Sequence, residues 1–450
     1  LDINDLATLT RAFDAVQDLI DQGLITAYHD VSDGGLITAV AEMCIAGNRG
    51  ASLRLPVGTD IFPVLFAEEP IMMIEYAPES RAKITRVMKK HGVIWSGKNQ
   101  IGVVDTKMGG NLRIYSARER WVDAPVTVLR QWWEKTSTEM EMLQANPETV
   151  EEESKTHADT RVHTYALSFT PTLVAPPVSS INRRRVKVAV VREEGTNGDR
   201  EMVATWEMAG CEVHDIAMED ILSGQVKSLG DFQIAAFPGG FSYADAYGSG
   251  KGAAAAIRFN PDVRDVFDRF FERADTLSLG VCNGFQLMTH LGVLSKRGMS
   301  DESRPWLIQN RSGRFESRWS VVKIEKNPAI MLAGMEGSIL GIHNDHGEGQ
   351  LHFPDPSVID DIREKGLAPI VYVDPDGDAT GRYPYNPNSS PLGWAALCSA
   401  DGRHLGLMPH PERCAIGMWQ WHYVPPEFGG LEVSPWLKMF TNARDQCLRG

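Results

Sequence analysis

A cysteine between two glycines is the clearest chemical signal in the sequence. Residues 279–286 read Leu-Gly-Val-Cys-Asn-Gly-Phe-Gln, where an apolar run ends at Cys282 and a helical pattern follows. Glycines on both sides let the backbone take the sharp strand-to-helix turn of a nucleophile elbow. Cys282 would then stand at a helix N-terminus, where the helix dipole and free N–H groups favour a thiolate. A single cysteine is more often a small buried residue, so the prediction depends on a second motif.

That second motif is Leu-Gly-Leu-Met-Pro-His-Pro-Glu-Arg at 405–413. A cysteine nucleophile needs a base for its proton, and the base needs a third group to hold its tautomer. His410 and Glu412 suit these two roles. In extended backbone, residues two apart project to the same side, so the carboxylate can reach the imidazole. By itself, His-Pro-Glu is more often a surface turn than a catalytic pair.

The elements around these motifs alternate between strands and helices. Apolar runs at 186–191, 212–217, 233–237 and 275–281 predict strands, and helical patterns separate them. Such alternation predicts a parallel sheet with helices on both faces. Sites in these folds lie at the C-terminal ends of the strands, so we expect the segments that follow 233–237 and 275–281 to meet at one edge.

The segment after 233–237 is Pro-Gly-Gly. Gly239 and Gly240 offer backbone N–H groups that approach a tetrahedral oxyanion without a side chain in the way, and the N–H of Asn283 is the natural second donor. The alternative is a plain turn. The position of the glycines before the elbow favours the oxyanion role.

The Gly-x-Cys-x-Gly elbow followed by His-Pro-Glu resembles the class I glutamine amidotransferases. This resemblance implies a flavodoxin-like, doubly wound α/β domain and a triad of Cys282, His410 and Glu412 that hydrolyses glutamine through a thioester intermediate. The oxyanion- and glutamine-binding residues are then predicted to be Gly239, Gly240, Asn283 and Gln286.

Near the N-terminus, a loop joins a predicted strand at 24–28 to a predicted helix at 36–45. It reads His-Asp-Val-Ser-Asp-Gly-Gly. Backbone donors, a hydroxyl and a carboxylate at a helix N-terminus are the parts of a phosphate and magnesium site. The alternative makes Ser32 or Asp33 an N-cap and the glycines a turn.

This loop resembles a signature of the C-terminal subdomain of the aminoimidazole ribonucleotide synthetase type, an α+β fold. Together with the glutaminase half, it resembles the C-terminal part of the large formylglycinamide ribonucleotide amidotransferases. The segments 192–200, 310–318 and 346–349 resemble the same family. The resemblance implies Asp30 as a magnesium ligand and Ser32 as a contact to bound ATP or ADP, with the other nucleotide ligands in preceding subdomains. His346, outside the triad, is predicted to be a structural histidine.

Composition sets bounds on the function. The chain has 450 residues, of which 43% are apolar and 23% charged, and its net charge of -14 argues against nucleic acid as a partner. Its six cysteines are scattered without disulfide or zinc spacing, which favours a reducing, cytoplasmic setting. No apolar run is long enough for a membrane helix, and no signal peptide is evident. The chain begins inside a helical pattern, so we expect it to be a fragment.

The predicted organisation is a synthetase-like subdomain at 1–118, a helical or irregular connection at 119–184, and the glutaminase domain at 185–450. Within the connection, a helix near Trp121 to Trp133 is expected to dock on another element, and the acidic run 148–153 is predicted to be a solvated face. Arg314, Glu316 and Arg318 alternate as on one strand face. They either orient the glutamine site or form a cross-strand charge ladder.

The predicted function is the glutaminase part of an ATP-dependent amidotransferase of purine synthesis. Ammonia from glutamine would convert formylglycinamide ribonucleotide to its amidine at a magnesium- and ATP-dependent site that this chain alone does not complete. Two alternatives remain: a glutaminase or other cysteine hydrolase that serves another acceptor, and a docking module whose triad is catalytically silent.

Overall fold

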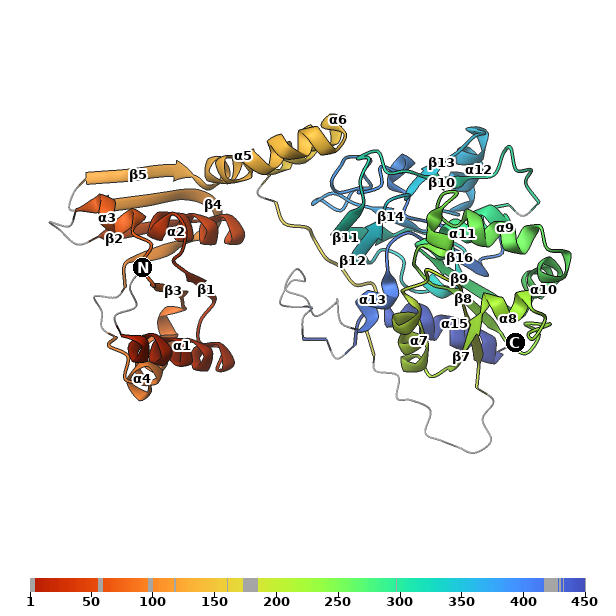
Figure 1. The fold of residues 1–450 in the computed structure, drawn as a ribbon, viewed down its shortest axis with the longest axis horizontal. Coiled ribbons are helices and arrows are strands. Elements are labelled where there is room, and N and C mark those ends of the chain that lie inside the picture. Colours follow the sequence, from red (N-terminus) through yellow and green to blue (C-terminus); the bar gives the residue numbers. More distant parts are fainter. Residues whose placement is uncertain are drawn as a thin grey trace. The chain divides into compact units, whose positions relative to one another are not determined.

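The computed structural model describes residues 5–55, 60–95, 100–116, 119–159, 161–172, 185–296, 298–416, 428, 430–431 and 433–449. The chain divides into two compact units. The first comprises Leu1–Glu141 and Ser154–Thr160, and the second Met142–Glu153 and Arg161–Gly450 (Figure 1). Residues 173–184 of the predicted connection lie outside the described residues.

The first unit mixes helices and short sheets. Its elements are α1 (Leu6–Asp21), β1 (Ala27–Asp30), α2 (Gly35–Gly47), β2 (Arg49–Leu55), α3 (Ile61–Phe66), β3 (Met72–Glu75), a 3₁₀ turn (Pro78–Ser80), α4 (Arg81–Lys90), β4 (Gly102–Ser116), β5 (Glu119–Pro125) and the start of α5 (Val126–Gln144).

Two cores hold this unit together. Apolar side chains of α1 and α4, among them Leu19 and Ile84, form one, and those of α2, α3, β2 and β4 form the other. The strands pair as β1 with β3 and in the order β2-β4-β5. The α+β class predicted for this part is confirmed, because helices pack with small sheets in both cores.

The strand β5 differs from its prediction. Residues 119–125 were expected in the connection, but they pair antiparallel with β4, so they belong to the first unit, and Trp121 lies in this strand rather than in a helix. The side chains of β5 are exposed or half-buried throughout. An edge strand of this kind lacks the alternation of buried and exposed residues by which strands are predicted.

The second unit is an α/β domain. Its elements are α6 (Pro147–Thr156), β6 (Lys187–Arg192), α7 (Asp199–Met208), β7 (Glu212–Ala217), α8 (Met218–Leu222), β8 (Ile234–Phe237), α9 (Lys251–Arg258), α10 (Pro261–Glu272), β9 (Leu277–Val281), α11 (Asn283–Leu291), β10 (Trp306–Ile308), β11 (Glu316–Ile324), β12 (Ile339–His346), β13 (Gln350–His352), α12 (Ser357–Lys365), β14 (Ile370–Tyr372), β15 (Ala396–Cys398), β16 (His404–Leu407), α13 (Pro411–Ile416) and α15 (Leu437–Arg449).

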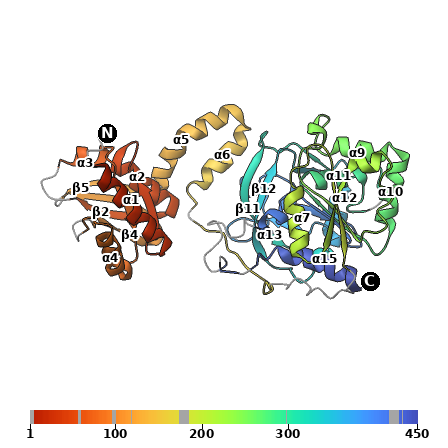
Figure 2. The ribbon, with the colours of Figure 1, turned by 60° about the horizontal axis from the view of Figure 1, so that its bottom comes forward.

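The main sheet of this unit has the order β15-β16-β9-β8-β6-β7, and every pair from β16 to β7 is parallel. The helices α7 and α15 lie on one side of it and α9, α10 and α11 on the other (Figures 1 and 2). Because both faces are covered, strands such as β8 are buried at every position. The doubly wound fold is confirmed, and the ends of β8, β9 and β16 bring their following segments to one edge.

A second, antiparallel sheet has the order β12-β11-β14. An isolated bridge joins His343 of β12 to His410, which follows β16. The edge strand β12 therefore touches the segment that carries the second chemical motif.

The helix α6 corrects the prediction for the acidic run. Glu152 pairs with Arg311 at 2.5 Å, and Glu153 pairs with Arg318 at 3.0 Å. Arg318 also pairs with Glu316 at 2.8 Å, whose carboxylate is fully buried and accepts a hydrogen bond from the Tyr383 hydroxyl at 3.0 Å. Glu152 and Glu153 are therefore half-buried members of a charge cluster, while Glu148 and Glu151 are exposed as predicted. The sequence hides this cluster because the arginines lie more than 150 residues away.

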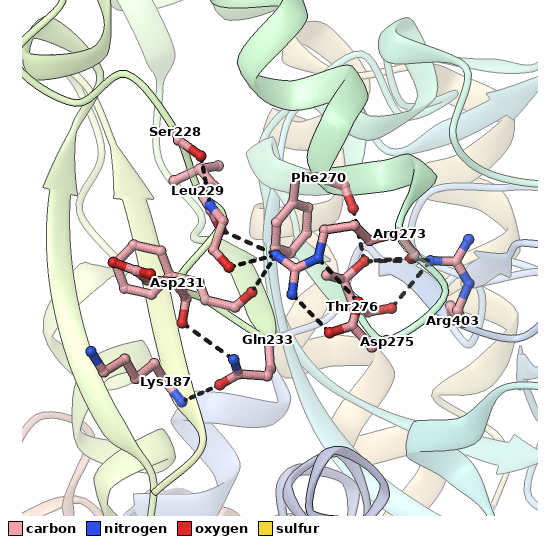
Figure 3. Close-up of polar contacts among 12 residues, drawn as sticks. Lys187, Ser228, Leu229, Asp231, Gln233, Phe270, Arg273, Asp275, Thr276 and Arg403 are labelled. Atoms are coloured by element: carbon pink, nitrogen blue, oxygen red, sulfur yellow. Dashed lines mark hydrogen bonds and ion pairs between the residues drawn. The ribbon is translucent and has the colours of Figure 1, made fainter. Parts of the chain in front are cut away.

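The N-terminal ends of the parallel strands are held by Arg273 (Figure 3). Its Nη1 donates to the carbonyl oxygens of Gly230 at 2.9 Å and Phe232 at 3.1 Å, just before β8. Its other nitrogens bind Asp275, just before β9. Arg403 in turn donates to the Arg273 carbonyl, just before β16. Arg273 thus fixes this end of the sheet, opposite the C-terminal strand ends.

Replacement of Arg273 by alanine is expected to lower the free energy of unfolding by about 2 kcal/mol, because hydrogen bonds to charged groups contribute more than neutral ones. Urea unfolding measures this loss. The control is Arg269→Ala. Arg269 is exposed and pairs with Asp265 within α10, so this change should lower the free energy of unfolding by only about 0.5 kcal/mol. Equal effects of the two changes would contradict the structural role of Arg273.

Candidate active site

The nucleophile elbow is present at Cys282. Cys282 lies between β9 and α11 with φ 51° and ψ -107°, so the cysteine itself carries the unusual backbone conformation. The flanking glycines were predicted to allow the sharp turn of the backbone, but the structure gives them a different role. A Cβ on Gly284 would lie 1.9 Å from the Phe237 carbonyl oxygen, and one on Gly280 would lie 2.6 Å from the Gly284 carbonyl oxygen. The glycines therefore let α11 pack closely against the sheet.

His410 and Glu412 form a buried pair. The Nδ1 of His410 lies 2.6 Å from the Glu412 Oε1, and the two side chains are 2% and 0% exposed. The sequence predicts an extended backbone between these two residues. Instead, Glu412 lies in the first turn of the helix α13. Burial disfavours the imidazolium, but the Glu412 carboxylate outweighs burial, so the pKa of His410 lies above its usual value.

Gly239 places the two halves of the site together. A Cβ on Gly239 would lie 2.7 Å from the Cε1 of His410 and 3.4 Å from the Cβ of Cys282. Only a residue without a side chain fits between the imidazole and the cysteine. The three segments that follow β8, β9 and β16 therefore meet at one point.

The Cys282 thiol lies near both the Asp345 carbonyl and the His410 imidazole, whose pKa it helps to raise. Its Sγ–H donates to the backbone carbonyl of Asp345 at 3.2 Å, and the Nε2 of His410 is buried without a hydrogen-bond partner among the described residues. A thiolate has no hydrogen to give this carbonyl, so the contact ends when the thiol loses its proton.

The predicted oxyanion segment is rigid. The Gly239 carbonyl accepts the N–H groups of Asn197 and Gly198, both at 3.1 Å. A Cβ on Gly240 would lie 2.5 Å from the Gly195 carbonyl oxygen. These contacts hold the Pro-Gly-Gly turn against the loop that follows β6, beside Cys282.

Asn283 and Gln286, at the start of α11, are bonded to each other and to the surrounding loops. The Nδ2 of Asn283 donates to the Gln286 Oε1 at 3.0 Å and to Asp245 at 3.3 Å. The Nε2 of Gln286 donates to the Glu348 carbonyl at 2.6 Å, and Gln286 is 3% exposed. The two amides thus join α11 to the segments at 245 and 348 that flank the cysteine.

The structure adds residues that the sequence does not single out. Asp345 pairs with His343 at 2.8 Å and with Arg413, while the His343 carbonyl accepts the His410 N–H at 2.8 Å. Arg413 directly follows the His-Pro-Glu motif, and this position is one sequence signal by which it could have been predicted as a site residue. His343 and Asp345 alternate as on a strand face, but only the long-range pairing of β12 shows their partner.

His346 is only partly satisfied in its hydrogen bonds, whereas the sequence favours a satisfied structural histidine. Its Nδ1 lies 3.1 Å from the Oδ1 of Asn310, which also accepts the Gly349 N–H, so Nδ1 is the protonated nitrogen. Burial lowers the pKa of His346 to about 3, and it stays neutral. Its Nε2 has no partner among the described residues.

The N-terminal loop offers few ligands. Asp30 and Ser32 are both exposed, and α2 is capped by Gly34 without a side-chain hydrogen bond, so neither Ser32 nor Asp33 is an N-cap. The Gly34 N–H, a donor that a phosphate would need, binds the Glu68 carboxylate at 3.0 Å. Nowhere in the described ranges do three His, Cys, Asp or Glu side chains gather as a metal site. The residues present here do not suffice for magnesium or nucleotide.

Comparison with known families identifies the second unit. A family model described as a CobB/CobQ-like glutamine amidotransferase domain matches residues 185–447, more than half of the chain. The chain belongs to this family. A second model, the C-terminal domain of proteins related to AIR synthase, matches residues 2–114.

The relatives that align with almost the whole chain share the same protein name. The chain is 41% identical over 463 residues to phosphoribosylformylglycinamidine synthase of Dictyostelium discoideum, across 98% of this chain and 34% of that protein. It is 42% identical over 458 residues to the Homo sapiens protein of the same name, across 98% and 34%. A probable chloroplastic or mitochondrial form from Arabidopsis thaliana is 43% identical over 462 residues, across 99% and 31%. The chain spans about a third of these relatives, and the predicted resemblance is confirmed.

Across the described part of the chain, no helix is both long and apolar enough to cross a membrane.

Proposed function

We propose that this chain hydrolyses glutamine with Cys282 as nucleophile, His410 as acid and base, and Glu412 as the group that orients His410. The observation that carries the proposal is the convergence of the buried His410–Glu412 pair and the Cys282 elbow on the bare backbone of Gly239. A surface turn or a buried structural cysteine would need none of these contacts.

The reaction has two stages. His410 takes the Cys282 proton, the sulfur attacks the side-chain carbonyl carbon of glutamine, and the carbon–nitrogen bond breaks as His410 returns the proton to the departing ammonia. A thioester remains. His410 then takes a proton from water, the hydroxide attacks the thioester carbon, and the carbon–sulfur bond breaks, which releases glutamate and restores the thiol.

Charge on the carbonyl oxygen in each stage needs fixed donors. We assign this role to backbone N–H groups of Gly239 or Gly240 and of Asn283, because these segments flank Cys282 and are held by the loop contacts. Gln286 and the Asn283 side chain shape the glutamine pocket, since their amides bind the neighbouring segments.

The whole protein is proposed to use the ammonia for purine synthesis. The relatives' name supports formylglycinamide ribonucleotide as acceptor, with ATP and magnesium at a site to which Asp30 and Ser32 contribute one edge. Magnesium would there neutralise phosphate charge and needs about six oxygen ligands, so other parts of the protein must complete the set. All six cysteines are free, which supports a reducing compartment such as the cytoplasm.

The test is glutamate release and amidine formation by the 450-residue chain. We expect slow hydrolysis, because the chain spans about a third of its relatives and the acceptor site that would set the active geometry is incomplete. We expect ATP with formylglycinamide ribonucleotide to change neither rate nor product. Amidine formation, or acceleration by the acceptor, would show that the chain completes the synthetase site.

Two alternatives have their own outcomes. Glutamate release no faster than that of Cys282→Ala would favour a silent docking module. Normal glutamine hydrolysis together with an inactive purine assay of the full-length protein would favour another acceptor.

A further inference from the structure

Two backbone carbonyls of the edge strand β12 accept hydrogen bonds from the proposed nucleophile, Cys282, and the proposed base, His410. The His343 carbonyl accepts the backbone N–H of His410 at 2.8 Å, and the Asp345 carbonyl accepts the Cys282 thiol at 3.2 Å. Residues two apart in a strand point their carbonyls to the same edge, about 6.6 Å apart. The distance between base and nucleophile therefore depends on the position of this one strand.

The Asp345 side chain ties that strand to the catalytic histidine's own segment. Its Oδ2 binds the His343 Nε2 at 2.8 Å and the Arg413 guanidinium. Arg413 directly follows Glu412 in α13, and its other carboxylate contact, to Glu201, is longer at 3.8 Å. Asp345 and Arg413 are 20% and 19% exposed. The carboxylate thus joins β12 to α13 within the protein interior.

The charge of Asp345 is stable in this place. Burial raises the pKa of the carboxyl group, but hydrogen bonds from His343 and the Ser317 hydroxyl, together with the charges of His343 and Arg413, outweigh it and hold the pKa at about 2. The carboxylate is therefore ionised at neutral pH.

We propose that Asp345 is a positioning residue for glutamine hydrolysis: its carboxylate clamps Arg413 and His343, and so fixes β12 relative to His410 and Cys282. This inference rests on the proposed glutaminase reaction. The side chain does not touch the glutamine; it acts through the two residues that it binds. A displacement of about 1 Å between reacting groups can cost on the order of 100-fold in rate.

The test compares Asp345→Asn with its parent chain. Asparagine keeps the shape but loses the charge that binds Arg413, so kcat for glutamate release should fall about 10- to 100-fold, while KM stays within about threefold. The matched control is Asp401→Asn. Like Asp345, Asp401 binds an arginine, Arg403, and one further side chain, here the Ser399 hydroxyl, but it lies beside the opposite end of β16. Its change should leave kcat within about twofold.

A double variant separates the clamp from general loosening. If Asp345 acts through Arg413, then Asp345→Asn with Arg413→Gln should be no slower than the slower single variant, because the pair is already broken. Additive losses, an unchanged kcat in Asp345→Asn, or an equal loss in Asp401→Asn would overturn the proposal. Absence of glutamate release by the parent chain would instead overturn the proposed function, and this inference with it.

Discussion

Cys282→Ala is expected to abolish glutamate release, by at least about 10³-fold, because no thioester can form without the sulfur. Alanine fills the space of the cysteine Cβ, and the close contacts of the elbow involve Gly280 and Gly284 rather than the thiol. The fold should therefore persist. Glutamate release and the melting temperature, measured on the same samples, check both statements.

Alkylation by a glutamine analogue extends this prediction. Burial raises the pKa of the thiols of Cys44, Cys211, Cys398, Cys414 and Cys447. A chloroketone analogue at pH 8 should therefore label Cys282 first, and excess glutamine should slow the labelling. Cys398→Ala serves as the control and should be labelled like the parent. Labelling spread over several cysteines, or release retained in Cys282→Ala, would remove Cys282 from the mechanism.

Glu412→Gln is expected to lower kcat by roughly 10²- to 10³-fold, less than His410→Ala. The amide keeps the shape of the carboxylate but cannot stabilise the imidazolium, and it can hold the wrong tautomer of the base. Because Glu412 is fully buried against His410, its charge acts with little screening by solvent. Steady-state kinetics with glutamine measure the loss.

The chain contains a matched control for this pair. In β7, His214 lies 2.9 Å from Glu212, also two residues away, but both side chains are about 40% exposed. Glu212→Gln should leave kcat unchanged. Parent-like activity of Glu412→Gln would show that another group orients His410.

The proximity of the candidate site residues was predictable because their types and spacing are local. The sequence marks Cys282 and the His410–Glu412 pair, and the alternating strands place them at one edge. The reasons given for two details were wrong. The flanking glycines serve close packing against Phe237 rather than the unusual φ, which Cys282 adopts itself. The carboxylate reaches His410 from a helical turn, not from extended backbone.

The supporting contacts were not predictable, since they depend on which strands pair. Asp345 meets Arg413 across 68 residues of sequence, and no local pattern encodes that pairing. The N-terminal loop shows the same limit: its sequence has the parts of a phosphate site, but Glu68, 34 residues from Gly34, occupies the backbone donor. β5 escaped prediction because an exposed edge strand carries no burial alternation.

The ion pairs of α6 determine where this chain can be divided. The amidotransferase family match begins at residue 185, yet the folding unit also includes Met142–Glu153. A polypeptide cut at 185 would remove Glu152 from Arg311 and Glu153 from Arg318, although Arg318 would keep Glu316. Because these pairs are partly exposed to solvent, each contributes on the order of 1 kcal/mol. The folding unit that carries Cys282 and His410 thus begins upstream of its recognisable sequence, and a cut at 185 would remove part of it.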